Sequence, residues 1–124
     1  MDGITFCAWR DGGYVELADV IELVRPGLPT LTWRLAIEEA VSTSERGAAE
    51  RLVDDVEMTL AQLLQVTAEV QIIDGRVVGR EAASRGDAIV IEAVDSTSWD
   101  VYAADSRVLQ VLRATFSDAE EIPR

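Results

Sequence analysis

The sequence predicts one α+β domain over residues 1–124, with three to four helices packed on a mostly antiparallel sheet of five to six strands. The length of 124 residues fits a single domain that removes roughly two-thirds of its unfolded surface from water. Hydrophobic residues make up 48% of the chain and recur without long gaps, which argues against disorder. Segments with a period of two residues alternate with segments of helical period, so we expect both strands and helices.

The N-terminal part is predicted to form a hairpin followed by a short helix. Residues 4–9 alternate in polarity and are rich in β-forming side chains, which indicates a first strand. Residues 10–13 read Arg-Asp-Gly-Gly, and two glycines suit a tight turn. We therefore expect residues 14–17 to pair back as a second strand. A short helix over 18–24 would then end before Pro26.

Residues 31–41 allow two interpretations. Apolar side chains occupy every second position from Leu31 to Ile37, which is the pattern of a half-buried strand of about ten residues. A helix would also bring Trp33, Ile37 and Val41 onto one face. We favour the strand, and the helix stays open as the alternative.

Two helices are predicted between residue 49 and about residue 71. The apolar residues of 49–57 fall on one helical face, opposite Glu50, Asp54 and Glu57. The sequence Thr59-Leu60-Ala61-Gln62 has the form of a capping box, so a second helix is expected to begin there. These two signals predict a break between two helices in place of one long helix.

A turn and a central strand are expected next. Asp74 and Gly75 indicate a tight turn into residues 76–81, and residues 84–87 a loop. Residues 88–94 are almost continuously apolar, which predicts a central strand packed on both faces.

The C-terminal part is predicted to contain a returning strand and a closing helix. Residues 95–98 form a turn and 99–103 return antiparallel. Asp105 and Ser106 would cap a helix that reaches Phe116. The acidic residues 118–124 suggest a short irregular tail or an edge strand.

The charge balance limits the kinds of partner. The chain has 23 acidic residues against 11 basic ones, and its formal net charge is −12. Such a field repels phosphate backbones and anionic membranes, so we expect neither nucleic-acid nor membrane binding. It favours cationic protein partners, although plain solubility would also explain it. The chain has no apolar run of roughly 18 residues and no secretory signal at its start, so a cytoplasmic location is expected.

The residue inventory argues against catalysis. The chain has no histidine, no lysine and a single cysteine. This removes the commonest general base and transition-metal ligand, Schiff-base chemistry and the phosphate-binding P-loop. Neighbouring carboxylates such as Asp54 and Asp55 diverge on a helix or a strand and do not converge on one atom. We therefore expect no enzyme, no cofactor and no metal site, and we expect Cys7 to be a small core residue.

Two acidic groups are candidate partner-binding sites. The first consists of the acids of the predicted helix, namely Glu50, Asp54, Asp55 and Glu57. The second is the predicted hairpin with Asp95, Trp99 and Asp100, where a tryptophan is flanked by charge as at many interfaces. Trp9 and Tyr14 around the Arg-Asp-Gly-Gly turn form a second-ranked aromatic cluster.

A resemblance is carried by the C-terminal third of the chain. Residues 89–102 form a strand, an Asp-Ser-Thr-Ser-Trp turn and a second strand, and a short helix over 108–116 follows. This arrangement resembles the C-terminal parts of small acidic bacterial proteins, and the size, charge and α+β make-up resemble immunity proteins encoded beside secreted toxins. The resemblance implies a non-enzymatic protein that occludes a basic toxin or nuclease. The alternatives are an assembly protein that forms a homo-oligomer (a homodimer, for example) and a carboxylate-based binder of a metal or small molecule.

Overall fold

The computed structural model describes residues 1–82 and 86–123. Its main sheet is antiparallel and has six strands in the order β4-β5-β6-β7-β1-β8. The strands of this sheet are β1 (Asp2–Cys7), β4 (Thr32–Ser42), β5 (Val70–Arg80), β6 (Asp87–Val94), β7 (Ser98–Ala103) and β8 (Glu120–Glu121). A separate two-stranded hairpin pairs β2 (Trp9–Arg10) with β3 (Gly13–Tyr14). Together with three α-helices this confirms the predicted α+β class and strand number.

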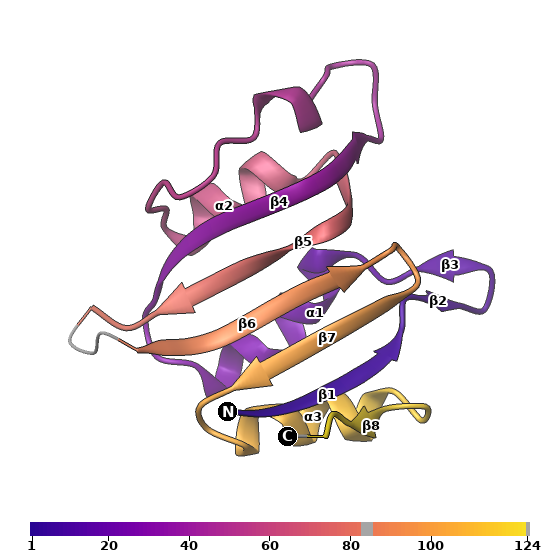
Figure 1. Ribbon diagram of the computed structural model, residues 1–124, viewed down its shortest axis with the longest axis vertical. Helices are drawn as coiled ribbons and strands as arrows, with labels where there is room; N and C mark the ends of the chain where they lie inside the picture. The colour runs from indigo at the N-terminus through magenta and orange to yellow at the C-terminus, as the bar shows by residue number, and fades with distance from the viewer. Residues whose placement is uncertain (83–85, 124) are drawn as a thin grey trace.

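The three α-helices cover one face of the main sheet. They are α1 (Leu17–Val24), α2 (Leu60–Thr67) and α3 (Arg107–Thr115), and two short 3-10 turns are η1 (Arg25–Gly27) and η2 (Ala49–Arg51). In Figure 1 all three helices lie behind the strands, and within the described residues no helix or loop crosses the front. We call this uncovered side the open face of the sheet.

Alternation along each strand separates the core from the open face. In β6, Ile89 and Ile91 are fully buried against the helices, whereas Val90 and Glu92, which point to the other side, are partly exposed. Trp33 in β4 and Trp99 in β7 lie on the buried side with them. The prediction that residues 88–94 are packed on both faces is therefore wrong. The strand is central, but helices cover only one side of it.

The same alternation corrects the expectation for Cys7. On the helix side of β1, Ile4 and Phe6 are buried, whereas Cys7 falls in the opposite phase and is exposed. An apolar stretch on a strand buries only every second residue when one face is uncovered.

Capping explains where α2 begins, and strand pairing explains where it ends. The Thr59 hydroxyl accepts from the backbone N–H of Gln62, and the Gln62 side chain accepts from the backbone N–H of Thr59. The predicted start is thus confirmed. The helix ends at Thr67, earlier than predicted, because Val70 already pairs with Ser42 in the sheet.

The strand interpretation of residues 31–41 is confirmed, and the predicted turn at Gly75 is wrong. Strand β4 spans Thr32–Ser42 and pairs with β5, which continues through Gly75 without turning. Gly75 has φ +154°, and a Cβ there would lie 2.9 Å from the Ala36 carbonyl oxygen. The glycine permits the close approach of the two strands beside an irregular step in their pairing.

The helix predicted over residues 49–57 is wrong. Only η2 forms, and residues 52–58, which we call the edge segment, run along the outer edge of β4. The backbone groups of Met58 and Trp33 exchange two hydrogen bonds of 2.8 and 2.9 Å, and the Asp55 N–H donates to the Leu35 carbonyl at 3.0 Å. These bonds satisfy backbone groups that an unpaired edge strand leaves open.

The strand predicted over 4–9 is broken at Ala8, and the strand predicted over 14–17 is shorter, because β3 ends at Tyr14 and α1 begins at Leu17. The elements after β6 follow the predicted order. Strand β7 returns antiparallel to β6, α3 buries Val108, Leu109 and Leu112, and the acidic end contributes β8 as an edge strand. Of the loop predicted over 84–87, residues 84 and 85 lie outside the described residues. Among the described residues, no helix has both the length and the apolar character that a membrane span requires.

Candidate binding site at the hairpin

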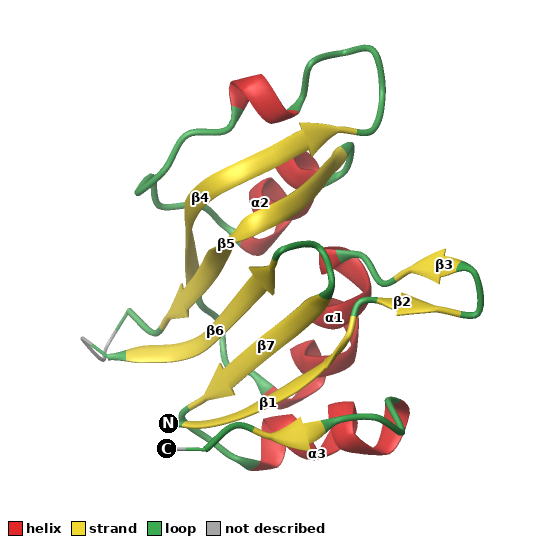
Figure 2. Ribbon diagram, turned by 45° about the vertical axis from the view of Figure 1, so that its right-hand side comes forward, coloured by secondary structure: helices red, strands yellow, loops and turns green. Residues whose placement is uncertain are grey.

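The β2–β3 hairpin holds an exposed tryptophan outside the main sheet. Asp11 and Gly12 form its turn with φ values of 48° and 78°, the left-handed pair that suits a two-residue hairpin connection. Trp9 and Tyr14 lie directly opposite each other on the two strands. Figure 2 shows the hairpin projecting beyond the ends of the long strands. The turn predicted at residues 10–13 is thus confirmed.

Trp9 is exposed and still firmly held. Its side chain is 55% exposed, and its indole N–H donates to the Ser96 carbonyl oxygen at 2.9 Å. The Tyr14 ring packs against it with centroids 5.0 Å apart, and Tyr14 in turn lies 6.3 Å from Trp99. Trp99 is in the core and donates its indole N–H to the Val15 carbonyl at 2.8 Å. A chain of three rings thus connects the exposed indole to the core.

The β6–β7 turn beside Trp9 has a strained backbone. Asp95 and Ser96 have φ values of 51° and 59°, a left-handed region that every residue except glycine adopts at some cost, smaller for aspartate than for serine. Three contacts from β5 hold the turn. The Asp74 carboxylate accepts from the Asp95 N–H at 2.8 Å, the Ile73 carbonyl accepts from the Ser96 N–H at 2.9 Å, and Gln71 donates to the Ser96 hydroxyl at 2.6 Å. Strain kept in place by surrounding contacts is a feature of many binding sites.

Carboxylates dominate the charge around Trp9. Asp11 and Asp95 are exposed in the two adjoining turns, and the Asp95 carboxylate makes no ion pair or hydrogen bond within the described residues. The neighbouring base, Arg10, is ion-paired with Asp118 and its guanidinium lies 4.6 Å from the centre of the Phe116 ring. We call Trp9, Asp11, Tyr14, Asp95 and Ser96 the hairpin surface.

Tyr14 stays protonated at neutral pH. Burial raises its pKa above the ordinary value of 10.0, and this effect outweighs the lowering by the Ser96 side chain, while the negative charge of Glu16 adds a smaller rise. The hairpin surface therefore combines a neutral aromatic pair with a rim of carboxylates.

The structure separates the residues of the predicted 95–100 cluster. Trp99 was expected to anchor a partner, but it is only 1% exposed and belongs to the core, so this assignment is corrected. Asp95 lies at the hairpin surface. Asp100 lies elsewhere, on the open face of the sheet, directly opposite Glu92. The second-ranked pair, Trp9 and Tyr14, takes the place that Trp99 was expected to fill.

The second predicted group lies on the edge segment and next to it. Three of its carboxylates have partners within the fold. Glu50 accepts from the Ser42 hydroxyl at 3.1 Å, Asp54 accepts from the Ile37 N–H at 3.0 Å, and Glu57 pairs with Arg34 at 2.8 Å. The exposed Asp55 carboxylate has no such contact among the described residues. These acids therefore stabilise the outer edge of β4, and a pocket of about 540 Å³ lies between the edge segment and α2.

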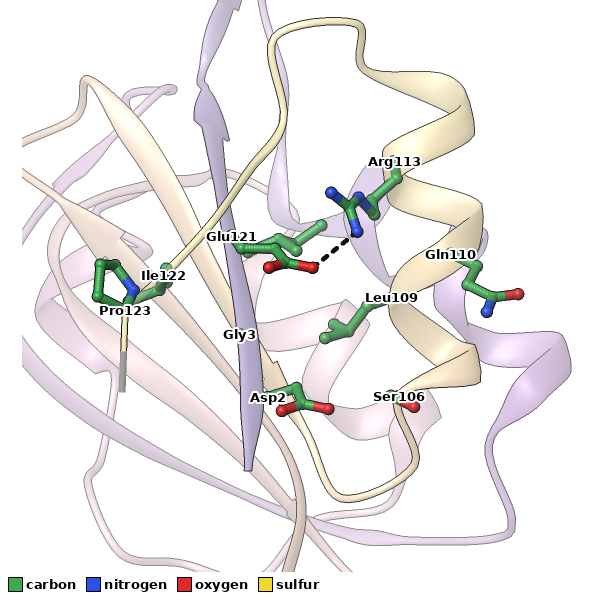
Figure 3. Close-up of a pocket in the computed structure, with 10 residues that line it drawn as sticks. Asp2, Gly3, Ser106, Leu109, Gln110, Arg113, Glu121, Ile122 and Pro123 are labelled. Atoms are coloured by element: carbon green, nitrogen blue, oxygen red, sulfur yellow. Dashed lines mark hydrogen bonds and ion pairs between the residues drawn. The ribbon is translucent and has the colours of Figure 1, made fainter.

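Another pocket, at the opposite edge of the sheet, already contains an ion pair. A pocket of about 590 Å³ lies between β1, β8 and α3. In Figure 3 Arg113 and Glu121 meet across it in an ion pair of 3.0 Å, so its cation is already neutralised. Over the described part of the chain, no three His, Cys, Asp or Glu side chains come together in a way that could hold a metal ion.

Comparison with known proteins returned nothing similar. No family model, no curated protein and no solved structure matches the chain. The hairpin surface is therefore interpreted from its own geometry.

The sequence pattern places Trp9 and Tyr14 in the second-ranked cluster and misses Ser96, together with the Gln71 contact that holds Ser96 in place. The Arg-Asp-Gly-Gly turn beside Trp9 was a usable signal, because a turn tip keeps its flanking side chains near solvent. Nothing local marks Ser96 or Gln71, since both act through contacts between distant strands.

Proposed function

We propose that the protein acts by binding a basic protein at the hairpin surface, in the manner of an immunity or inhibitor protein that occludes a toxin or nuclease. The observation that carries the proposal is the exposed but fixed position of Trp9. Its indole is more than half exposed, and its position is nonetheless set by a hydrogen bond and a ring contact. An apolar side chain presented to solvent in a fixed orientation is suited to a partner.

The energetics favour an aromatic anchor with an acidic rim. A side chain that is ordered before binding loses little conformational entropy when the complex forms. Tryptophan is also enriched among the few residues that dominate binding energy. The face of an indole attracts Arg or Lys cations by about 0.5–2 kcal/mol, and the carboxylates of Asp11 and Asp95 attract the same cations from a longer range.

The composition of the chain supports a binding function in preference to a catalytic one. The sequence has neither histidine nor lysine, and its net charge of −12 raises the association rate with cationic proteins. Acidic side chains would replace the phosphates that a nuclease binds, and Trp9 would supply the apolar contact.

The proposal is tested with Trp9→Ala. Immunity proteins are encoded beside their toxins, so the binding partner to measure is the product of the adjacent gene. We expect the substitution to weaken this affinity about 30-fold, the loss of a residue worth about 2 kcal/mol. Val111→Ala, which truncates another exposed apolar residue, on α3, is the matched control and should leave the affinity unchanged. Equal affinities of the wild type and Trp9→Ala, with both folded by circular dichroism, would reject the hairpin surface.

A further inference from the structure

The open face of the sheet carries two regular rows of side chains. Strand register places the members of each row side by side across β4, β5, β6 and β7. The first row is Ala36, Arg76, Glu92 and Asp100. The second row is Arg34, Val78, Val90 and Tyr102. The order of charged and apolar side chains in each row defines which groups a molecule packed on this face would meet.

These rows are electrically neutral on a strongly acidic protein. Among the row residues, Arg34 and Arg76 equal Glu92 and Asp100 in formal charge, although Arg34 is already paired with Glu57 at 2.8 Å and the whole chain has a net charge of −12. Val78 and Val90 form an apolar centre between them, and both are only half-buried. The central residues Arg76, Val78, Val90 and Glu92 therefore have no net formal charge, and the excess negative charge lies outside this centre.

The isolated chain leaves charges on this face without partners. Glu92 and Asp100 lie directly opposite each other on neighbouring strands, an arrangement of like charges that destabilises a sheet. Within the described residues Arg76, Glu92 and Asp100 make no ion pair or hydrogen bond through their side chains. Counter-charges from another molecule would relieve this repulsion.

We propose that a second copy of the chain packs on the open face, related by a two-fold axis parallel to the strands and aligned with the gap between β5 and β6. This operation places β5 over β6 of the second copy and β4 over its β7. Arg76 then faces Glu92 of the other copy, and Glu92 faces the other Arg76. In the second row Val78 faces Val90, and Arg34, whose guanidinium stays paired with Glu57 of its own chain, lies opposite Tyr102.

The facing side chains of the two copies are best aligned at the centre of this arrangement. Packed sheets lie about 10 Å apart and cross at about 30°, which displaces outer contacts more than central ones. The central contacts are the two Arg76–Glu92 pairs and the two Val78–Val90 contacts, and each occurs twice because a two-fold interface is reciprocal. A neighbour of any other kind would have to supply this same order of charges.

The size of the patch predicts a modest affinity. Four strands and about five residues of each make an area of roughly 20 by 17 Å. This is smaller than the usual protein–protein interface of about 800 Å² on each partner. We therefore expect a dimer that forms reversibly in the micromolar range. The inference goes beyond the proposed function, because the hairpin projects beyond the ends of the long strands and is not part of the open face (Figure 2).

The experiment measures mass in solution by sedimentation equilibrium over a concentration series. The wild type should shift from 13.5 kDa to twice that mass as its concentration rises. Arg76→Glu and Glu92→Arg should each be monomeric, because each places like charges opposite each other. An equimolar mixture of the two variants should recover the dimer, because every facing pair is then Arg with Glu. Arg25→Glu, the same change on η1, should dimerise like the wild type.

Recovery in the mixture separates the interface from effects within one chain. Arg76 and Glu92 are also neighbours within one sheet, but mixing two chains cannot repair an internal contact. A wild type that stays at 13.5 kDa at millimolar concentration, or variants that dimerise as well as the wild type, would overturn the proposal. So would folded monomeric variants whose mixture stays monomeric. If a variant fails to fold, Arg76→Gln and Glu92→Gln replace the pair, and each should weaken dimerisation about 10-fold.

Discussion

The β2–β3 hairpin and the edge segment both expose apolar side chains beside carboxylates, but the two regions use them differently. In the edge segment Val53 and Val56 are 60% and 48% exposed, comparable with Trp9 at 55%. The Asp54 carboxylate there is hydrogen-bonded to the backbone of β4, whereas the Asp95 carboxylate beside Trp9 has no such contact. The Asp54 carboxylate therefore helps to hold the segment that covers the edge of β4, whereas the Asp95 carboxylate is available to a partner.

The comparison shows that the hydrogen-bond and ion-pair partners of a carboxylate reveal more about its role than its exposure does. Edge strands invite unwanted pairing, and a covering segment with acidic side chains prevents it. A rigid aromatic with unpaired acids around it is suited to a partner. The predictions that follow separate these two roles, and their expected effects are given from the largest to the smallest.

Met58→Pro should break the edge segment. The proline has no N–H to donate to the Trp33 carbonyl, a bond of 2.9 Å, and it would leave that part of the β4 edge unpaired. We expect a loss of about 3 kcal/mol in unfolding free energy and greater aggregation, measured by urea denaturation and light scattering. Met58→Leu keeps the N–H and should lose less than about 1.5 kcal/mol. Equal losses in the two variants would contradict the role of the backbone bond.

Asp54→Ala should lower stability by about 1–2 kcal/mol without affecting the hairpin. The substitution removes the acceptor of the Ile37 N–H, and an unpaired backbone donor is costly. Urea denaturation measures the loss. Asp54→Asn keeps an acceptor oxygen and should recover part of the stability. A stable Asp54→Ala variant would show that the carboxylate is free for another role.

Asp95→Gly should raise stability by about 0.5 kcal/mol. Asp95 has φ 51°, which glycine adopts without a steric cost, and the backbone N–H that donates to Asp74 remains. Asp55 has φ 59° in the edge segment, so Asp55→Gly should have a gain of the same size. Thermal unfolding measures both. A gain at Asp55 with a loss at Asp95 would mean that the Asp95 carboxylate itself stabilises the fold.

Tyr14→Phe should reduce the loss of stability at alkaline pH. The folded state raises the Tyr14 pKa above 10.0, so the folded protein holds this proton more tightly than the unfolded chain. Stability from this group is complete below about pH 10 and falls as the pH rises through the folded-state value. Unfolding free energies measured above and below about pH 10 should therefore differ less in Tyr14→Phe than in the wild type. Parallel pH profiles would contradict the burial of this hydroxyl.

The sequence predicted those parts of the fold that depend on neighbouring residues. The capping box of Thr59 and Gln62 located the start of α2, and the period of two residues identified β4. The helix predicted over 49–57 failed because its residues pair with the distant edge of β4, and tertiary hydrogen bonds outweigh a local helical pattern. Alternation alone cannot show which edge lacks a neighbour.

The candidate site was only partly predictable for a related reason. Trp99 shares a strand phase with Val101 and Ala103, while Asp100 falls between them, so the alternation already indicated a buried tryptophan. Trp9 follows the end of β1 and lies outside that alternation. Its hydrogen bond to Ser96 joins residues that are 87 positions apart, which no local pattern contains.

The most direct test compares Asp95→Asn with Asp55→Asn in binding to the adjacent-gene product at several salt concentrations. Both aspartates are exposed, both have a left-handed backbone that asparagine tolerates, and both have free carboxylates among the described residues. Only Asp95 adjoins Trp9. Asp95→Asn should weaken binding several-fold and reduce its salt dependence, and Asp55→Asn should change neither. Weaker binding from Asp55→Asn together with unchanged binding from Asp95→Asn would contradict the hairpin surface as the binding site.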